Sequence, residues 1–206
     1  MYKRQTLYIG TNEGLYAYDY INNQCDLCSP LLKSKNIIAY QCNSDYQIVA
    51  TDREVFLFDY NWNFIHKITI YKESLNNHIT SMAIYGNQEV LLGTESGLVI
   101  IHIGNDDKTK INTLYSGDKI VQLFIDSRNK LWICRGEEIL YSNIDTLDSV
   151  EISEFKHIAY NHEVISFFEY ANQVWVGTRG YGISIYEYDH SCLLYTSDAA
   201  DDMQCV

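Results

Sequence analysis

The chain has 206 residues, of which 47% are hydrophobic and 20% charged, a composition typical of a folded globular protein rather than a disordered one. Its formal net charge is −12. This charge argues against a general nucleic-acid binder and against an anionic membrane surface as partner, since both require a basic face. No apolar run approaches the roughly 20 residues of a membrane span. The 18 Tyr residues and the single Pro favour strands over helices.

Five segments of the chain share one pattern. They begin, in chain order, at Leu7, Gln47, Val90, Leu131 and Val174. A Thr recurs at the same place in four of them, at Thr11, Thr51, Thr94 and Thr178, and Arg135 takes its place in the fourth segment. The spacings between these positions are 40, 43, 41 and 43 residues. A period this regular indicates a repeat architecture.

Each repeat predicts four short strands. An apolar stretch such as ITSMAIYG precedes the shared segment, and further strands and a polar segment follow it. Four strands in about 42 residues is the period of a β-propeller blade, whereas a β-sandwich has no fixed period. We therefore expect an all-β fold of about five four-stranded antiparallel blades over residues 2–190. Counting the repeats gives 18 strands and predicts a propeller fragment that is incomplete at both ends.

Residue size is also coordinated between the repeats. The residue before the Thr position is always small, and the residue three before it is always large and apolar. The small residues are Gly10, Ala50, Gly93, Cys134 and Gly177, and the large ones are Tyr8, Ile48, Leu91, Trp132 and Trp175. We expect the small residues to lie against a neighbouring blade or turn, and the Trp side chains to pack between blades rather than to bind a ligand. Gly14, Gly97 and Gly182 are expected in hairpins that need a positive φ.

Burial is predicted for one residue set, on the first strand of the repeats. Its members are Met82, Ile84, Leu123, Ile125, Phe167 and Phe168.

The C-terminal segment 192–206 begins CLLYTSDAADD. This run is similar to the in-frame translation of a transposon-end sequencing adapter, so we expect 192–206 to be read-through rather than native sequence, without a packed apolar face. Four cysteines then remain, Cys25, Cys28, Cys42 and Cys134.

The repeats resemble the two-component regulator propeller family, the sensor region of bacterial hybrid histidine kinases. The resemblance rests on Ile120–Ile133 and Val174–Asp189 and extends over about residues 2–190. It implies a propeller sensor whose ligand response reaches a kinase. Two departures stand out, because Asn129 replaces a turn Gly of the family and Cys134-Arg135 replaces Gly-Thr. WD-type and quinoprotein-like propellers are wider relatives that share the W-x-G-T core.

Candidate ligand contacts are the positions at which one repeat departs from the others near a loop. Arg135 stands where the other repeats have Thr, Arg179 follows the Thr of the fifth repeat, and Tyr181 is close by. Loops tolerate changes that stacked strands do not. We therefore predict Arg135, Arg179 and Tyr181 as ligand-binding residues at one rim, with simple surface variation as the alternative.

Catalytic and metal-binding motifs are not evident. Cys25 and Cys28 form half of a zinc or redox motif, with only Cys42 near and His66 as a distant candidate ligand, so ordinary thiols are the default. His157 and His162 do not form a zinc-protease motif. We expect no metal, no cofactor and no enzymatic activity of the propeller itself.

These observations predict a non-catalytic recognition module, most simply the sensor region of a two-component signalling protein. An intracellular WD-type scaffold for protein–protein interactions is the alternative, and a quinoprotein-like enzyme fits less well. The expected partners are a small-molecule or oligosaccharide ligand or a protein, not nucleic acid or a membrane. The compartment stays open, periplasmic for a sensor and cytoplasmic for a scaffold.

Overall fold

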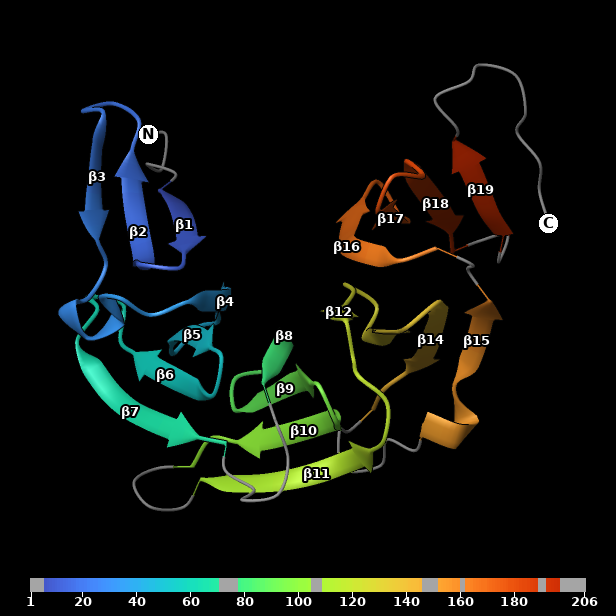
Figure 1. The fold of residues 1–206 in the computed structure, drawn as a ribbon, viewed down its shortest axis with the longest axis horizontal. Helices are drawn as coiled ribbons and strands as arrows, with labels where there is room; N and C mark the ends of the chain where they lie inside the picture. The colour runs from blue at the N-terminus through green and yellow to red at the C-terminus, as the bar shows by residue number, and fades with distance from the viewer. Residues whose placement is uncertain are drawn as a thin grey trace. The chain divides into compact units, whose positions relative to one another are not determined.

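The computed structural model describes residues 6–70, 78–104, 109–145, 152–159, 162–188 and 192–196. These residues form five small antiparallel sheets, which we call blades 1 to 5 (Figure 1). The helical elements among them are two three-residue 3-10 turns, η1 (Pro30–Leu32) and η4 (Ile152–Glu154). No helix in the described ranges is long and apolar enough to cross a membrane. The predicted all-β class is confirmed.

Residues 1–79 form one compact unit, which contains blades 1 and 2. Blade 1 consists of β1 (Leu7–Thr11), β2 (Gly14–Asp19) and β3 (Gln24–Leu27). Blade 2 consists of β4 (Ile37–Cys42), β5 (Gln47–Thr51), β6 (Glu54–Phe58) and β7 (Phe64–Thr69). Strands pair with their sequence neighbours in both blades.

Residues 80–206 form the second unit, which contains blades 3, 4 and 5. Blade 3 consists of β8 (Ile79–Tyr85), β9 (Glu89–Thr94), β10 (Gly97–His102) and β11 (Lys110–Ser116). Blade 4 consists of β12 (Gln122–Ile125), β13 (Lys130–Arg135), β14 (Glu138–Asn143) and β15 (Lys156–Ala159). Blade 5 consists of β16 (Val164–Tyr170), β17 (Gln173–Thr178), β18 (Ile183–Glu187) and β19 (Cys192–Thr196).

The last strand departs from the sequence prediction. The backbone of Cys192–Thr196 pairs with β18 as the fourth strand of blade 5, so the described residues hold 19 strands rather than 18. An unpaired strand edge offers its N–H and C=O groups to any extended segment, which is why pairing here does not depend on a repeat pattern. The adapter origin of 192–206 remains a proposal, and residues 197–206 lie outside the described residues.

The small residues before the Thr position lie where a neighbouring blade approaches. A Cβ added to Gly93 would lie 2.8 Å from Cγ2 of Ile120, which precedes the first strand of blade 4, and 2.4 Å from Oγ of Ser81. At Gly10 the corresponding contact is Cγ2 of Ile37 in blade 2, at 3.0 Å. The predicted close approach of blades is therefore confirmed at both glycines, because a larger side chain would push neighbouring blades apart.

Apolar side chains fill the space between neighbouring blades within each unit. Leu15, Leu32, Val49, Phe56 and Phe58 form the cluster of the first unit. The second unit has one cluster between blades 3 and 4, which includes Leu91 and Ile133, and another between blades 4 and 5, which includes Trp132 and Tyr186. Each interface buries side chains of two repeats, as expected for stacked repeats.

The predicted burial of the first strands is confirmed only in part. Met82 and Leu123 are buried, at 3% and 5% exposure. Ile84, Ile125 and Phe167 are partly buried. The prediction is wrong for Phe168, which is 63% exposed, because it points to the face of blade 5 opposite the one that packs on blade 4.

Candidate functional site

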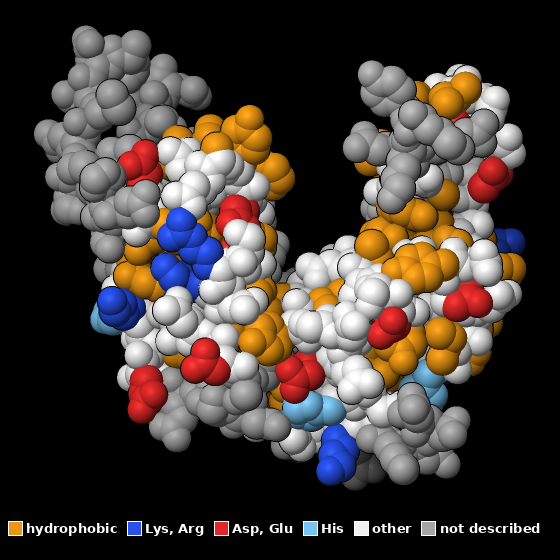
Figure 2. Space-filling view, turned by 180° about the vertical axis from the view of Figure 1, so that it is seen from behind, with side chains coloured by type: hydrophobic (Ala, Val, Ile, Leu, Met, Phe, Trp, Pro, Cys, Tyr) orange, Lys and Arg blue, Asp and Glu red, His pale blue; other side chains and the backbone are white. Residues whose placement is uncertain are grey.

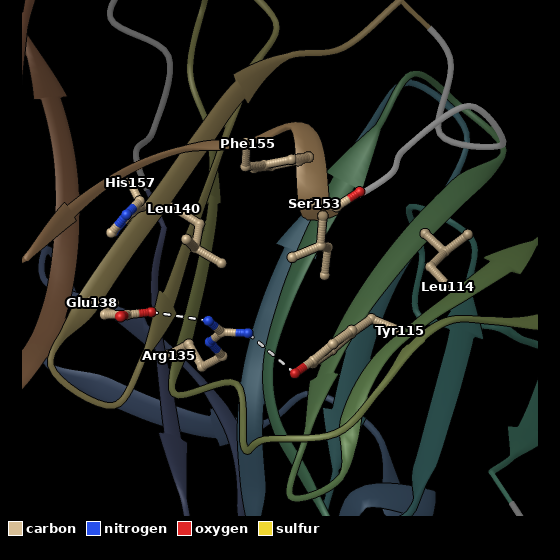
Figure 3. A pocket seen from close by; sticks show the side chains of 9 residues that line it. Leu114, Tyr115, Arg135, Glu138, Leu140, Ser153, Phe155 and His157 are labelled. Atoms are coloured by element: carbon tan, nitrogen blue, oxygen red, sulfur yellow. Dashed lines mark hydrogen bonds and ion pairs between the residues drawn. The ribbon is translucent and has the colours of Figure 1, made fainter.

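An open groove of about 560 Å³ lies over the interface between blades 3 and 4 (Figure 3). Its walls come from β11 on one side and from β13, β14, η4 and β15 on the other. Leu114, Leu140, Ile152 and Phe155 are its apolar residues, and they continue the apolar cluster between the two blades. The remaining residues are polar, namely Tyr115, Arg135, Glu138, Ser153 and His157. The groove thus combines an apolar floor with a few polar groups, as small-molecule sites do.

Arg135 lies in this groove because its side chain does not form the hydrogen bond that the repeated Thr forms within its own hairpin. In blade 3, the Thr94 hydroxyl donates to the Gly97 carbonyl at 2.9 Å and so closes the hairpin between the second and third strands. Thr11 and Thr178 make the same bond to Gly14 and Gly182. A guanidinium is too long for that bond, and the Arg135 side chain extends across the groove instead.

The Arg135 guanidinium links the two blades (Figure 3). Nη2 donates to Glu138 Oε2 at 2.9 Å within blade 4, and Nη1 donates to the Tyr115 hydroxyl of blade 3 at 3.1 Å. Asp118 Oδ2 lies 3.7 Å from Nη1. The bond from Arg135 holds the pKa of the Glu138 carboxyl below its usual value, and the bond to Glu138 raises the pKa of Arg135. Both groups are therefore charged at neutral pH and fixed in place.

Arg179 and Tyr181 lie in the hairpin between β17 and β18, outside the lining of this groove. The Arg179 side chain is 73% exposed and its Nε lies 2.9 Å from Glu163 Oε2. Tyr181 is 66% exposed, and its ring stacks on His162 with centroids 3.9 Å apart. The three predicted rim residues are thus divided between the groove, which holds Arg135, and an exposed aromatic and charged turn of blade 5.

Cations near these hairpins of the second unit are paired with acids. Lys119 lies 2.9 Å from Glu95, and Arg135 and Arg179 have the carboxylate partners given above. On the face shown in Figure 2, the described Lys and Arg side chains lie in one small group and at a few separate places, and they form no continuous basic surface. The arrangement therefore lacks, among the described residues, the excess positive charge that a polyanion requires.

Several groove residues could not be found from the sequence. Tyr115, Phe155 and His157 belong to the fourth strands of their blades or to the segment before them, which carry no repeated pattern. A missed signal does exist in the second repeat, where Arg53-Glu54 stands in place of the usual Gly. This departure has the same form as the one that singled out Arg135, and it marks a second pocket, at blade 2.

The candidate metal ligands are not gathered into a site. Among the residues that the structure describes, no group of three or more His, Cys, Asp or Glu side chains is arranged to hold a metal ion. His157 lines the groove, whereas His162 stacks on Tyr181. Cys25, Cys28, Cys42 and Cys134 are free thiols.

We expect the four thiols to differ sharply in their reactivity. Burial raises the pKa of Cys134 to about 11 and that of Cys28 to about 12, whereas Cys25 and Cys42 are exposed. The thiolate is the reacting species, so iodoacetamide at pH 8 should modify Cys25 and Cys42 at least about tenfold faster than Cys134. Peptide mass mapping over time measures this. In urea the four rates should become similar, and equal rates in the folded protein would contradict the burial of Cys134.

Comparison with known proteins was made for the sequence and for the structure. No protein-family model and no curated protein matches the sequence. The structure is similar to the extracellular domain of the hybrid two-component system BT4673 from B. thetaiotaomicron, with a TM-score of 0.55, 18% identity, and coverage of 100% of this chain and 27% of that one. It is also similar to PorZ, a surface component of the type-IX secretion system of Porphyromonas gingivalis, with a TM-score of 0.62, 12% identity, and coverage of 98% and 26%.

A third similar structure is BBS1N in complex with ARL6DN, with a TM-score of 0.64, 17% identity, and coverage of 93% of this chain and 65% of that one. The chain has the β-propeller fold. The predicted blades are therefore confirmed as propeller blades. The propeller described here spans about a quarter of the length of the BT4673 and PorZ chains and about two thirds of the BBS1N chain.

Proposed function

We propose that this propeller is a non-catalytic ligand- or partner-binding module that serves as the sensor region of a two-component signalling protein. The groove between blades 3 and 4 carries the proposal, because Arg135, Tyr115 and Glu138 converge there over an apolar floor. The similarity of fold to an extracellular domain of a hybrid two-component system supports the sensor role.

The chemistry of the groove favours a neutral ligand with both polar and apolar faces. The positive charge of Arg135 is already balanced by Glu138 and Asp118, so an anionic ligand gains little attraction there. The hydroxyl groups of a neutral ligand would accept a hydrogen bond from Arg135 and exchange hydrogen bonds with Ser153 and His157. Its apolar face would lie on Leu140 and Phe155. Neutral oligosaccharides have this combination of faces, and so do uncharged segments of a protein partner.

A protein-interaction scaffold of the WD type is the second candidate. It is supported by the similarity to BBS1N, which was crystallised in complex with ARL6DN. Sequencing the gene on both sides of the region that encodes residues 1–206 distinguishes the sensor from the scaffold. A histidine-kinase core in the same reading frame would support the sensor, whereas introns or the further domains of a scaffold would support the alternative and overturn the sensor.

A glycan array followed by calorimetry tests the groove. For the neutral oligosaccharide that binds most tightly, Arg135→Met is expected to weaken binding about tenfold or more, because a hydrogen bond from a charged group contributes about 1.5–3 kcal/mol. Lys110→Ala, on the exposed part of β11, is the control and should leave the affinity unchanged. A separate Arg179→Ala/Tyr181→Ala variant tests the blade 5 turn. If Arg135→Met and Arg179→Ala/Tyr181→Ala both bind as the parent does, neither place is the site.

A further inference from the structure

A second pocket, of about 490 Å³, lies at one end of blade 2 in the first unit. All nine residues that line it are polar or charged, in contrast to the apolar floor of the groove beside Arg135. They come from the segment before β4, from the ends of β5 and β6 and the turn between them, from the end of β7, and from His78. A lining of this kind suits a small, strongly hydrophilic ligand, since an apolar one would bury nothing against it.

The acidic groups of this pocket are already bonded. Glu54 accepts from Lys35 at 2.7 Å and from Lys67 at 2.8 Å, and the bonds to these two lysines hold its pKa below the usual value. Asp52 accepts from the Asn36 amide at 2.9 Å through Oδ1. The lining itself holds two cations, Lys35 and Arg53, against these two carboxylates, and Lys67, which bonds Glu54 from outside the lining, adds one positive charge. The surplus of one positive charge stands in a protein whose formal net charge is −12.

Arg53 is the one of these three cations that is not bonded to either of the two carboxylates. Its contact in the described part of the chain is Nη2 to Nε2 of His78 at 3.4 Å, which is long for a hydrogen bond, and no carboxylate of the described residues forms an ion pair with it. Arg135, Arg179 and Lys119 each have one. A guanidinium presents paired donors that match a carboxylate. Arg53 would lose little by exchanging its contact with His78 for a bidentate carboxylate.

The backbone holds Arg53 in place for such a ligand. The carbonyl of Arg53 accepts from the Ile70 amide at 3.0 Å, and the carbonyl of Asp52 accepts from the Ile79 amide at 2.7 Å. Both residues of the turn between β5 and β6 are thereby tied to flanking segments. A fixed backbone lowers the entropic cost of ordering a binding residue, so only the Arg53 side chain must adjust.

We propose that this pocket binds a small hydroxylated monocarboxylate, with Arg53 on the carboxylate group. The ligand's hydroxyl groups would donate to the second oxygen of Asp52 and accept from Asn36. A phosphate dianion is disfavoured, because the Asp52 and Glu54 carboxylates would repel its second charge. This proposal concerns the first unit and goes beyond the function proposed for the groove between blades 3 and 4.

Gluconate, sorbitol and glucose 6-phosphate are the probes that test the proposal, since they share a hydroxylated chain or ring and differ in charge. Calorimetry with the full chain should show gluconate bound at least about tenfold more tightly than sorbitol, because one charge-assisted pair contributes about 1.5 kcal/mol or more. Glucose 6-phosphate should bind more weakly than gluconate. Absence of gluconate binding, or tighter binding of sorbitol or glucose 6-phosphate, would overturn the proposal.

Variants at Arg53 locate the binding. Arg53→Gln should weaken gluconate binding about tenfold or more and leave sorbitol unaffected, and Arg53→Lys should fall between, since it keeps the charge but loses the paired donors. Lys119→Gln removes an exposed, paired cation of the other unit and should not change the affinity. Circular dichroism checks that each variant is folded. Unchanged gluconate affinity in folded Arg53→Gln would place the carboxylate elsewhere.

Discussion

Replacing Trp132 with alanine is expected to lower the free energy of unfolding by about 3–5 kcal/mol, the range for removal of a buried large aromatic side chain. Trp132 is fully buried between blades 4 and 5, where its ring centroid lies 4.9 Å from that of Tyr186 and 5.1 Å from that of Tyr141. Its Nε1 also donates to Asp126 Oδ2 at 2.8 Å. The substitution therefore opens a cavity and removes one partner of a buried carboxylate.

Urea unfolding followed by circular dichroism measures the loss. Trp132→Phe keeps a ring in the interface and removes the bond to Asp126, so it should cost less than Trp132→Ala. Trp175→Ala is the matched control, because Trp175 occupies the corresponding place in blade 5 but is only partly buried. It should destabilise the protein less than Trp132→Ala. A loss below about 1 kcal/mol for Trp132→Ala would show that Trp132 is peripheral to the core.

Packing between blades could be predicted because every blade has to pack against the next one in the same way. The small residue at Gly10 and Gly93 and the large one at Leu91 and Trp132 recur because each blade must approach the next at one place and fill the space at another. The repeated Thr is explained by the hydrogen bond that closes the hairpin in the four repeats that have it. These features are local and periodic, so the sequence displays them.

Which face of a strand is covered could not be predicted. The run VISFF of β16 is apolar on both sides. Phe167 stacks on Phe124 of blade 4, with centroids 6.1 Å apart, whereas Phe168 pairs across the sheet with Trp175 and points to the opposite face. The alternation of side chains along a strand identifies its two faces. Which face is covered depends on where the neighbouring blade lies, and the sequence of the strand does not show this.

The candidate site was predicted at one residue only. Arg135 is visible in the sequence because it breaks the Thr pattern. Its partner Tyr115 is not visible, because it belongs to the fourth strand of the preceding blade. Glu138, the other partner, breaks the hairpin Gly pattern, since it stands where Gly14 and Gly97 stand in other repeats. Comparing every hairpin with the consensus, instead of the Thr position alone, would also have singled out Arg53.

The prediction that Gly97 has a positive φ was correct, but it gave only one of the two reasons why a glycine is needed there. The hairpin position predicted a positive φ, and Gly97 has φ +128°. Yet a Cβ there would also lie 2.1 Å from the Tyr115 carbonyl oxygen and 2.9 Å from its carbon. These are backbone atoms of β11, which pairs with β10, so no side-chain rotation relieves the contact. Gly97 is required by the close approach of β11 as well as by its own conformation.

Gly97→Ala is therefore expected to destabilise the second unit by about 3–5 kcal/mol, the combined cost of a strained backbone and of a shift in the neighbouring strand. Gly136→Ala is the matched control. It lies in the corresponding hairpin of blade 4 with φ +59°, and its Cβ would meet nothing within 4 Å, so it should cost only about 1–2 kcal/mol. Urea unfolding of the two variants gives the difference. Since Tyr115 lines the groove beside Arg135, Gly97→Ala should also weaken oligosaccharide binding there, which Gly136→Ala should leave intact. Equal losses of stability in the two variants would mean that β11 does not approach Gly97 as closely as its pairing with β10 requires.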